Sequence, residues 1–176
     1  MKMLASLLLM LCLYNVSTAQ DDAEKPTLSK AEEFSSQSGT LIHIEFVEVG
    51  TVRLIKFRVL KIKDLITGKN TTALRMDYPY ANDDQVTTLD SDEMDGFIKT
   101  IKAFQNDIFN TKPKNYTEIT FRSRTGFEAG AYFSVDKEKW VGYFKIEDFI
   151  RSPTIFLTRE HYAEVLEVLE KAKKMM

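Results

Sequence analysis

The chain has 176 residues, of which 44% are hydrophobic and 28% are charged, a composition that suits one globular domain with its own core. Lysine and arginine number 24 against 26 aspartates and glutamates, so the net charge of −2 gives no electrostatic case for binding nucleic acid or an anionic membrane. Cys12 is the only cysteine, which excludes a disulfide within the chain and leaves stability to packing.

Residues 1–19 have the three-part layout of a secretory signal peptide. Lys2 gives a positive start, Leu4–Leu13 is an apolar run, and Ser17–Ala19 supplies small residues before a cleavage site at Gln20. The run is shorter than the roughly 20 residues that span a bilayer. We therefore expect an exported protein, periplasmic or secreted, with no transmembrane segment in the mature chain; the alternative is a short membrane anchor.

Residues 20–38 are polar and predict a flexible lead-in to a single domain at 39–176. Within the lead-in, Ser29 and Glu32 have the spacing of a capping box, which favours a short helix through Phe34.

The domain opens with an expected hairpin of Thr40–Val49 and Val52–Lys63, in which Gly50 and Thr51 form a type II′ turn. This register places Phe46 opposite Ile55. A third strand is predicted over residues 71–78, where apolar and polar residues alternate.

Residues 79–89 are rich in Asp and Asn and are expected to form a loop. A helix is predicted over 92–109, opened by a capping box of Asp90 and Glu93. Gly96 lies inside this helix, where glycine is unfavourable, and therefore predicts close packing at that point.

Three strands of a meander follow, at 116–123, 127–135 and 140–146, and a short apolar strand is expected at 154–157. The last helix is predicted to begin after Thr158 as its N-cap. The element order βββ-α-ββββ-α predicts an α+β fold with about seven antiparallel strands and helices packed on one face. A pleckstrin-homology-like barrel with a C-terminal helix is the architectural alternative.

The sequence offers little catalytic chemistry. His43 and His161 are the only histidines, and neither lies in a zinc motif. No serine nucleophile motif or phosphate-binding glycine loop is present, so no catalytic, cofactor-binding or metal-ligating residue is assigned. The acidic run Asp90–Asp95 misses the spacing of a calcium loop and leaves open only a weak calcium site.

Tyrosines are the candidate contact residues, because a ring with a polar tip suits a binding surface. Tyr78 and Tyr80 flank a proline, and Tyr132 is expected opposite Tyr143 on the solvent face of the meander. A peptide, glycan or lipid is the expected contact there. The alternative is a cross-strand tyrosine pair that only stabilises the sheet.

The signal ending in Ser17–Ala19, the acidic lead-in Asp21–Lys25, and the segments Phe34–Leu41 and Tyr116–Ile119 give the chain a family resemblance. It is similar to small uncharacterised exported proteins of the Bacteroidetes. The resemblance implies a periplasmic or secreted bacterial protein and carries no catalytic residues with it.

Three functional hypotheses follow. The first is an exported, non-enzymatic binding or scaffold domain whose partner is an unknown protein, a glycan or a small apolar ligand. The second is a carrier that encloses a small apolar ligand between sheet and helix, with Phe133, Trp140 and Phe144 lining the cavity. The third is a hydrolase, which would require two carboxylates, or a histidine and a nucleophile, converging in a cleft.

Overall fold

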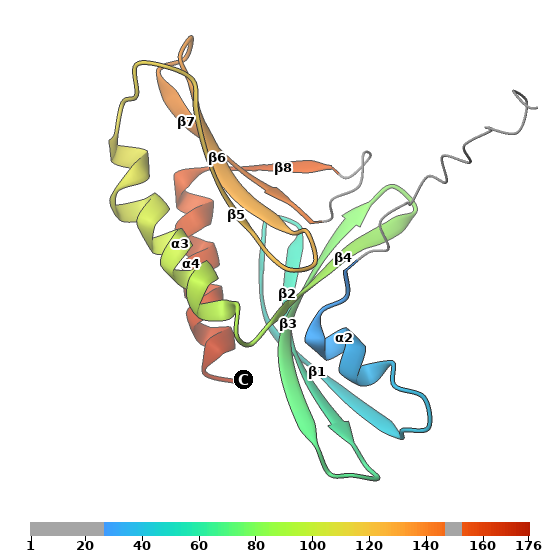
Figure 1. Ribbon diagram of the computed structural model, residues 1–176. Helices are drawn as coiled ribbons and strands as arrows, with labels where there is room; N and C mark the ends of the chain where they lie inside the picture. Colours follow the sequence, from blue (N-terminus) through green and yellow to red (C-terminus); the bar gives the residue numbers. More distant parts are fainter. Residues whose placement is uncertain (1–26, 147–152) are drawn as a thin grey trace, which may run out of the picture.

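The computed structural model describes residues 27–146 and 153–176, so the predicted signal peptide lies outside the described residues. The strands form two four-stranded antiparallel sheets, ordered β1-β2-β3-β4 and β5-β6-β7-β8 (Figure 1). The strands are β1 Ile42–Val52, β2 Ile55–Asp64, β3 Asn70–Tyr80, β4 Asp83–Asp90, β5 Thr117–Arg122, β6 Glu128–Ser134, β7 Lys139–Lys145 and β8 Thr154–Leu157. The helices are α2 Lys30–Ser35, α3 Met94–Asn106, the 3-10 turn η2 Ile108–Asn110 and α4 Arg159–Lys173.

The α+β class with antiparallel strands is confirmed, and the described strands number eight where about seven were expected. The described residues form two separate sheets, and neither closes into the barrel that was the alternative. Each half of the domain is a four-stranded meander followed by a helix, α3 after the first and α4 after the second. The two helices pack against each other (Figure 1). None of the described helices is both long and apolar enough to cross a membrane.

The segment predicted as a loop at 79–89 forms most of β4. Tyr80 pairs with Asp83 across a tight turn in which Ala81 has a φ of 55°. The acidic residues suggested a loop, but Val86, Thr87 and Thr88 are β-branched, and the neighbouring β3 gives them a strand to pair with.

The first hairpin turns at Arg53 and Leu54, so the predicted Gly50–Thr51 turn is wrong. Val52 pairs with Ile55, and the register shifts between Glu48 and Gly50. Phe46 consequently faces Leu60 rather than Ile55. Gly50 is small for a different reason: a Cβ there would lie 3.0 Å from Val168 of α4.

The helices do not all lie on one face of the first sheet. The inward residues of β2 and β3, among them Phe57 and Leu74, join α3, α4 and the second sheet in the main core. Leu60 and Ala73 point to the opposite face, where they form a small cluster with Ala31 of α2. Helices α3 and α4, the two in the predicted element order, share the main core, whereas α2 covers the opposite face because alternate residues of these strands are apolar on both sides.

Helix α2 is capped as the sequence predicts. Ser29 and Glu32 form the reciprocal capping box. The carboxylate of Asp90 also accepts hydrogen bonds from the free N–H groups of Lys30 (2.8 Å) and Ala31 (3.0 Å), which ties the helix start to the end of β4.

The second half agrees more closely with the sequence. Arg122 pairs with Glu128 across a turn in which Gly126 has a φ of 86°, and Thr158 caps α4. Tyr132 faces Val141 rather than Tyr143, because the β6–β7 turn begins one residue earlier than expected. Glu138 adopts a positive φ of 47° to make that turn.

The glycines give a matched stability test. A Cβ at Gly142 would lie 2.5 Å from the ring of Tyr162 and 2.9 Å from the carbonyl oxygen of Leu157, whereas a Cβ at Gly96 meets only Phe121 at 3.8 Å. The close packing expected at Gly96 is therefore wrong. In urea unfolding, Gly142→Ala should lower the free energy of unfolding by about 2 kcal/mol or more. Gly96→Ala should raise it by roughly 0.5–1 kcal/mol; equal effects would contradict this packing.

Candidate functional site

The features that a hydrolase would need do not converge in the part of the chain that is described. His43 is exposed on β1. The Nδ1 atom of His161 lies 3.0 Å from both the backbone nitrogen and the hydroxyl of Thr158, where it completes the cap of α4. This use of His161 is structural, because the ring satisfies the exposed start of a helix.

The acidic residues at the end of β4 and just after it lie close together, but they already form ion pairs with basic side chains of the protein. Carboxylate oxygens of Asp90, Asp92 and Glu93 lie within 4.8 Å of one another. Arg124 forms ion pairs with Asp90 and Asp92, and its backbone N–H donates to Glu93 at 2.7 Å. Lys30 pairs with Asp92 at 2.6 Å, and this hydrogen bond lowers the pKa of Asp92. The geometry favours a structural ion-pair cluster over the weak calcium site considered above.

Only half of the predicted capping box of α3 forms. The Glu93 side chain accepts a hydrogen bond from the Asp90 backbone N–H at 3.1 Å. The Asp90 side chain instead reaches α2 and Arg124, and it is 3% exposed as a residue.

Removal of Asp90 should therefore destabilise several elements at once. Asp90→Ala should lower the free energy of unfolding by about 2–4 kcal/mol, because it leaves two backbone N–H groups of α2 without their acceptor and removes the most buried of the carboxylates that pair with Arg124. Asp92→Ala is the matched control on an exposed carboxylate and should cost less than about 1 kcal/mol. Similar losses in the two variants, measured by urea unfolding, would show that Asp90 is not the centre of the cluster.

The four candidate tyrosines do not form one surface. Tyr78 packs against the main core and Tyr80 is 44% exposed at the β3–β4 turn. Tyr132 stacks on Tyr116 with ring centroids 6.1 Å apart. Tyr143 is only 3% exposed, and its ring covers Gly130.

Tyr143 is held by polar neighbours on the outer face of the second sheet. Its hydroxyl donates to Glu118 at 2.6 Å and lies 2.8 Å from the hydroxyl of Thr120. Burial, followed by the hydrogen bond to Glu118, raises the pKa of Tyr143 to about 12. The same hydrogen bond lowers the pKa of Glu118.

The raised pKa of Tyr143 predicts a loss of stability in strong base. The folded protein keeps this phenol protonated at a pH where the unfolded chain, with a pKa near 10.0, has lost the proton. The contribution of Tyr143 is fully present below pH 10 and is lost as the pH rises towards about 12. Tyr143→Phe should flatten this decline in urea unfolding series across that window; a decline of unchanged steepness would contradict the assignment.

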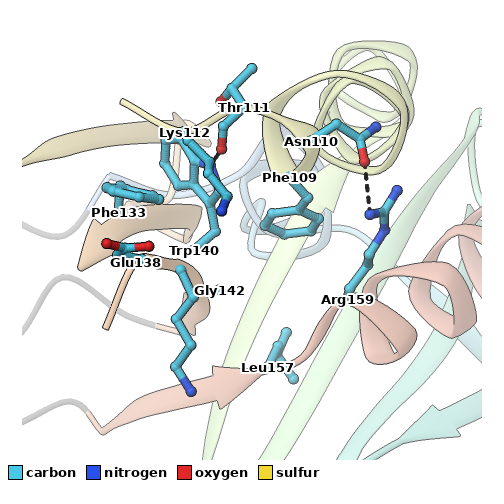
Figure 2. A pocket seen from close by; sticks show the side chains of 11 residues that line it. Phe109, Asn110, Thr111, Lys112, Phe133, Glu138, Trp140, Gly142, Leu157 and Arg159 are labelled. Atoms are coloured by element: carbon cyan, nitrogen blue, oxygen red, sulfur yellow. Dashed lines mark hydrogen bonds between the residues drawn. The ribbon is translucent and has the colours of Figure 1, made fainter. Parts of the chain in front are cut away.

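A pocket of about 250 Å³ lies where η2, the start of β7, the end of β8 and the start of α4 meet (Figure 2). Aromatic and aliphatic walls come from Phe109, Phe133, Trp140 and Leu157. Trp140 and Phe133 are in edge-to-face contact at 5.6 Å. The indole N–H of Trp140 donates to the carbonyl oxygen of Thr111 at 3.0 Å, which fixes the ring at the mouth.

Positive charge surrounds the opening. Lys112, Lys139 and Arg159 line the pocket together with one carboxylate, Glu138. Among residues 27–146 and 153–176, no carboxylate lies within ion-pair distance of these three cations. The Arg159 guanidinium is oriented by neutral groups. It donates to the side-chain oxygen of Asn110 at 2.9 Å (Figure 2) and to the Gln105 carbonyl oxygen at 2.8 Å.

Two of the three aromatic residues expected to line a carrier cavity do so. Phe133 and Trp140 border the pocket, whereas Phe144 is fully buried in the main core. The volume is below the roughly 300 Å³ at which ordinary ligand cavities begin, so any molecule that the pocket encloses must be small.

Sequence reasoning missed the polar half of this site. Lys112 follows η2 and Arg159 opens α4, and only the packing of these elements brings them beside Trp140. A Lys-Pro-Lys sequence at 112–114 is the one local signal, and it does not identify a partner.

No protein-family model matches the chain. A search of curated proteins likewise finds no significant match.

Proposed function

We propose that this protein is an exported, non-enzymatic binding domain, and that its ligand is a small molecule with a flat apolar body and an acidic group. The expectation of export is supported by the layout of residues 1–19. The single observation that carries the binding proposal is the pocket in which aromatic walls meet cations that lack a carboxylate partner among the described residues. It is the carrier hypothesis in a narrower form.

The aromatic walls favour a planar ligand. Trp140 and Phe109 offer ring faces and edges, and Leu157 extends the apolar surface. A pocket of this kind derives affinity from apolar contact and orientation from a few polar groups. The site opens to solvent beside exposed residues such as Lys112 and Lys139, so the polar end of the ligand remains near water.

The cations favour an anion over a neutral ligand. A guanidinium has five N–H donors in a fixed plane, and the Arg159 side chain makes two hydrogen bonds to residues that the structure describes. The remaining donors, with Lys112 and Lys139, suit a carboxylate, sulfonate or phosphate group.

The proposal has a direct optical readout because Trp140 is the only tryptophan of the chain. The probe is para-nitrobenzoate, whose nitroaromatic ring quenches indole fluorescence on contact. We expect saturable quenching, and weaker quenching by para-nitrobenzyl alcohol, which has a similar ring but no charge. Equal quenching by the two compounds would reject the anion preference, and a linear response without saturation would reject the site.

Substitution separates the pocket from general charge effects. Arg159→Gln should weaken binding of para-nitrobenzoate by about tenfold, since it removes charge-assisted hydrogen bonds. Lys61→Gln makes the same change of charge on exposed β2, in the other sheet, and should leave the affinity unchanged. An equal loss in both variants would mean that the probe responds to net charge alone.

A further inference from the structure

The first sheet has an open edge that is independent of the pocket. β1 is an outer strand of its sheet, and four consecutive residues, 43–46, are exposed. Ile44 is 38% exposed and Phe46 is 47% exposed. Residues 42–48 contain no lysine or proline, two of the residue types that natural proteins place on such an edge, and the register shift lies at the end of this segment, between Glu48 and Gly50. An unblocked edge of this kind is a template for another strand.

The open part of the edge has clear limits. Lys171 of α4 donates to the Val49 carbonyl oxygen at 2.9 Å, and Val168 packs against Gly50, so α4 occupies the far end of β1. The register shift between Glu48 and Gly50 separates this end from the rest of the strand. Helix α2 lies mainly over β2, β3 and β4 (Figure 1). In the described part of the chain no other strand pairs with the outer side of residues 42–48, so they are the segment available for pairing.

We propose that two copies of this chain pair through β1, antiparallel, about a two-fold axis at Ile44. In this register Ile44 of one copy faces Ile44 of the other. His43 of each copy faces Glu45 of the other, and Ile42 faces Phe46. A two-fold interface uses the same patch on both copies, so each favourable pair is formed twice.

The chemistry of the strand selects this register. In an antiparallel pair of identical strands, side chains of the same face meet only if the two-fold axis passes through a residue position. If the axis passes between two residues, each face of one strand meets the opposite face of the other. Centring the pair on Glu45 opposes two carboxylates, centring it on His43 opposes two imidazoles, and centring it on Phe46 sets Ile44 against Glu48. Only the axis at Ile44 pairs apolar residues with apolar residues and an acid with a histidine.

His43 and Glu45 lie opposite Lys63 and Lys61 of β2, and they can also reach a strand on the outer side of β1. Neither His43 nor Glu45 has an ion-pair partner among the residues that the structure describes. Both side chains are exposed on one side of the strand, and the apolar Ile44 and Phe46 are exposed on the other. The β1 strand of a second copy, lying beside the first in the plane of the sheet, would contact the side chains on both faces. It would also pair with the backbone N–H and C=O groups that point outward from the edge.

Disulfide trapping tests the register directly. In a chain that carries Cys12→Ser, single cysteines are placed at 43, 44, 45 and 46 and oxidised at equal protein concentration. Ile44→Cys should cross-link most, because facing Cα atoms lie about 4.5–5.5 Å apart. His43→Cys and Glu45→Cys should each cross-link poorly alone, since the two cysteines are then diagonal neighbours about 7–8 Å apart. A mixture of the two variants should cross-link well, because residue 43 of one copy faces residue 45 of the other. A maximum at another position overturns the register, and no cross-link at any position overturns the pairing.

A charge exchange tests the interface without cysteine. Sedimentation of the full chain should show a dimer that Glu45→Lys weakens by about tenfold or more, because the pair between Glu45 and His43 is then lost in two places. The double variant His43→Glu with Glu45→Lys should restore it. A monomeric wild-type chain, or a double variant that stays as weak as Glu45→Lys with unchanged unfolding behaviour, would overturn the proposal.

Discussion

Tyr162 joins the parts of this domain that would otherwise be separate. The side chain is fully buried where α4 crosses the second sheet, and its ring packs edge-on against Phe104 of α3 and Phe144 of β7. Its hydroxyl donates to the backbone carbonyl of Gly130 in β6. Burial holds the pKa of this phenol far above its usual range, so the hydroxyl remains a donor. Gly142 must be small because the same ring occupies the space above it.

The pocket depends on this anchor. Phe109 contacts Tyr162 edge-on at 5.2 Å, so η2 is held against the sheet and helix that form the other walls. Gly142 borders the pocket and also lies under the Tyr162 ring. The walls are thus fixed by core packing, while the cations project from a turn, a strand end and the first residue of a helix. A rigid apolar wall with adaptable charged groups is an arrangement that orients a small ligand at low entropic cost.

The parts of the fold that were predictable have local causes. Thr158 and Ser29 begin helices by capping them, and Gly126 makes its turn through its own backbone freedom, so each could be recognised from the sequence. Gly50 was misread because it is small to admit Val168 of a distant helix. β4 was missed because its acidic start resembles a loop until β3 lies beside it.

The same distinction holds for the candidate site. Aromatic residues on a meander can be assigned to a face by alternation, which identified Phe133 and Trp140. The cations Lys112 and Arg159 come from separate elements and meet through tertiary packing. Alternation placed Tyr132 and Tyr143 on one face of the meander, but it could not show that Tyr143 is buried there by its contacts with Gly130 and Glu118. The proposed binding site beside Tyr162 therefore rests on the arrangement of its aromatic walls and cations in the fold, which the residue composition does not reveal.

The indole N–H of Trp140 gives the most direct test of this binding site, since it is a single signal in a proton–nitrogen correlation spectrum and is hydrogen-bonded to Thr111 at the mouth of the pocket. We expect titration with para-nitrobenzoate to shift the indole signal and the backbone signals of Phe109, Gly142 and Arg159 with one common affinity. The backbone signals of β1 and β2 should stay in place. A titration that leaves the indole signal unmoved, or that moves signals across both sheets alike, would contradict the proposed site.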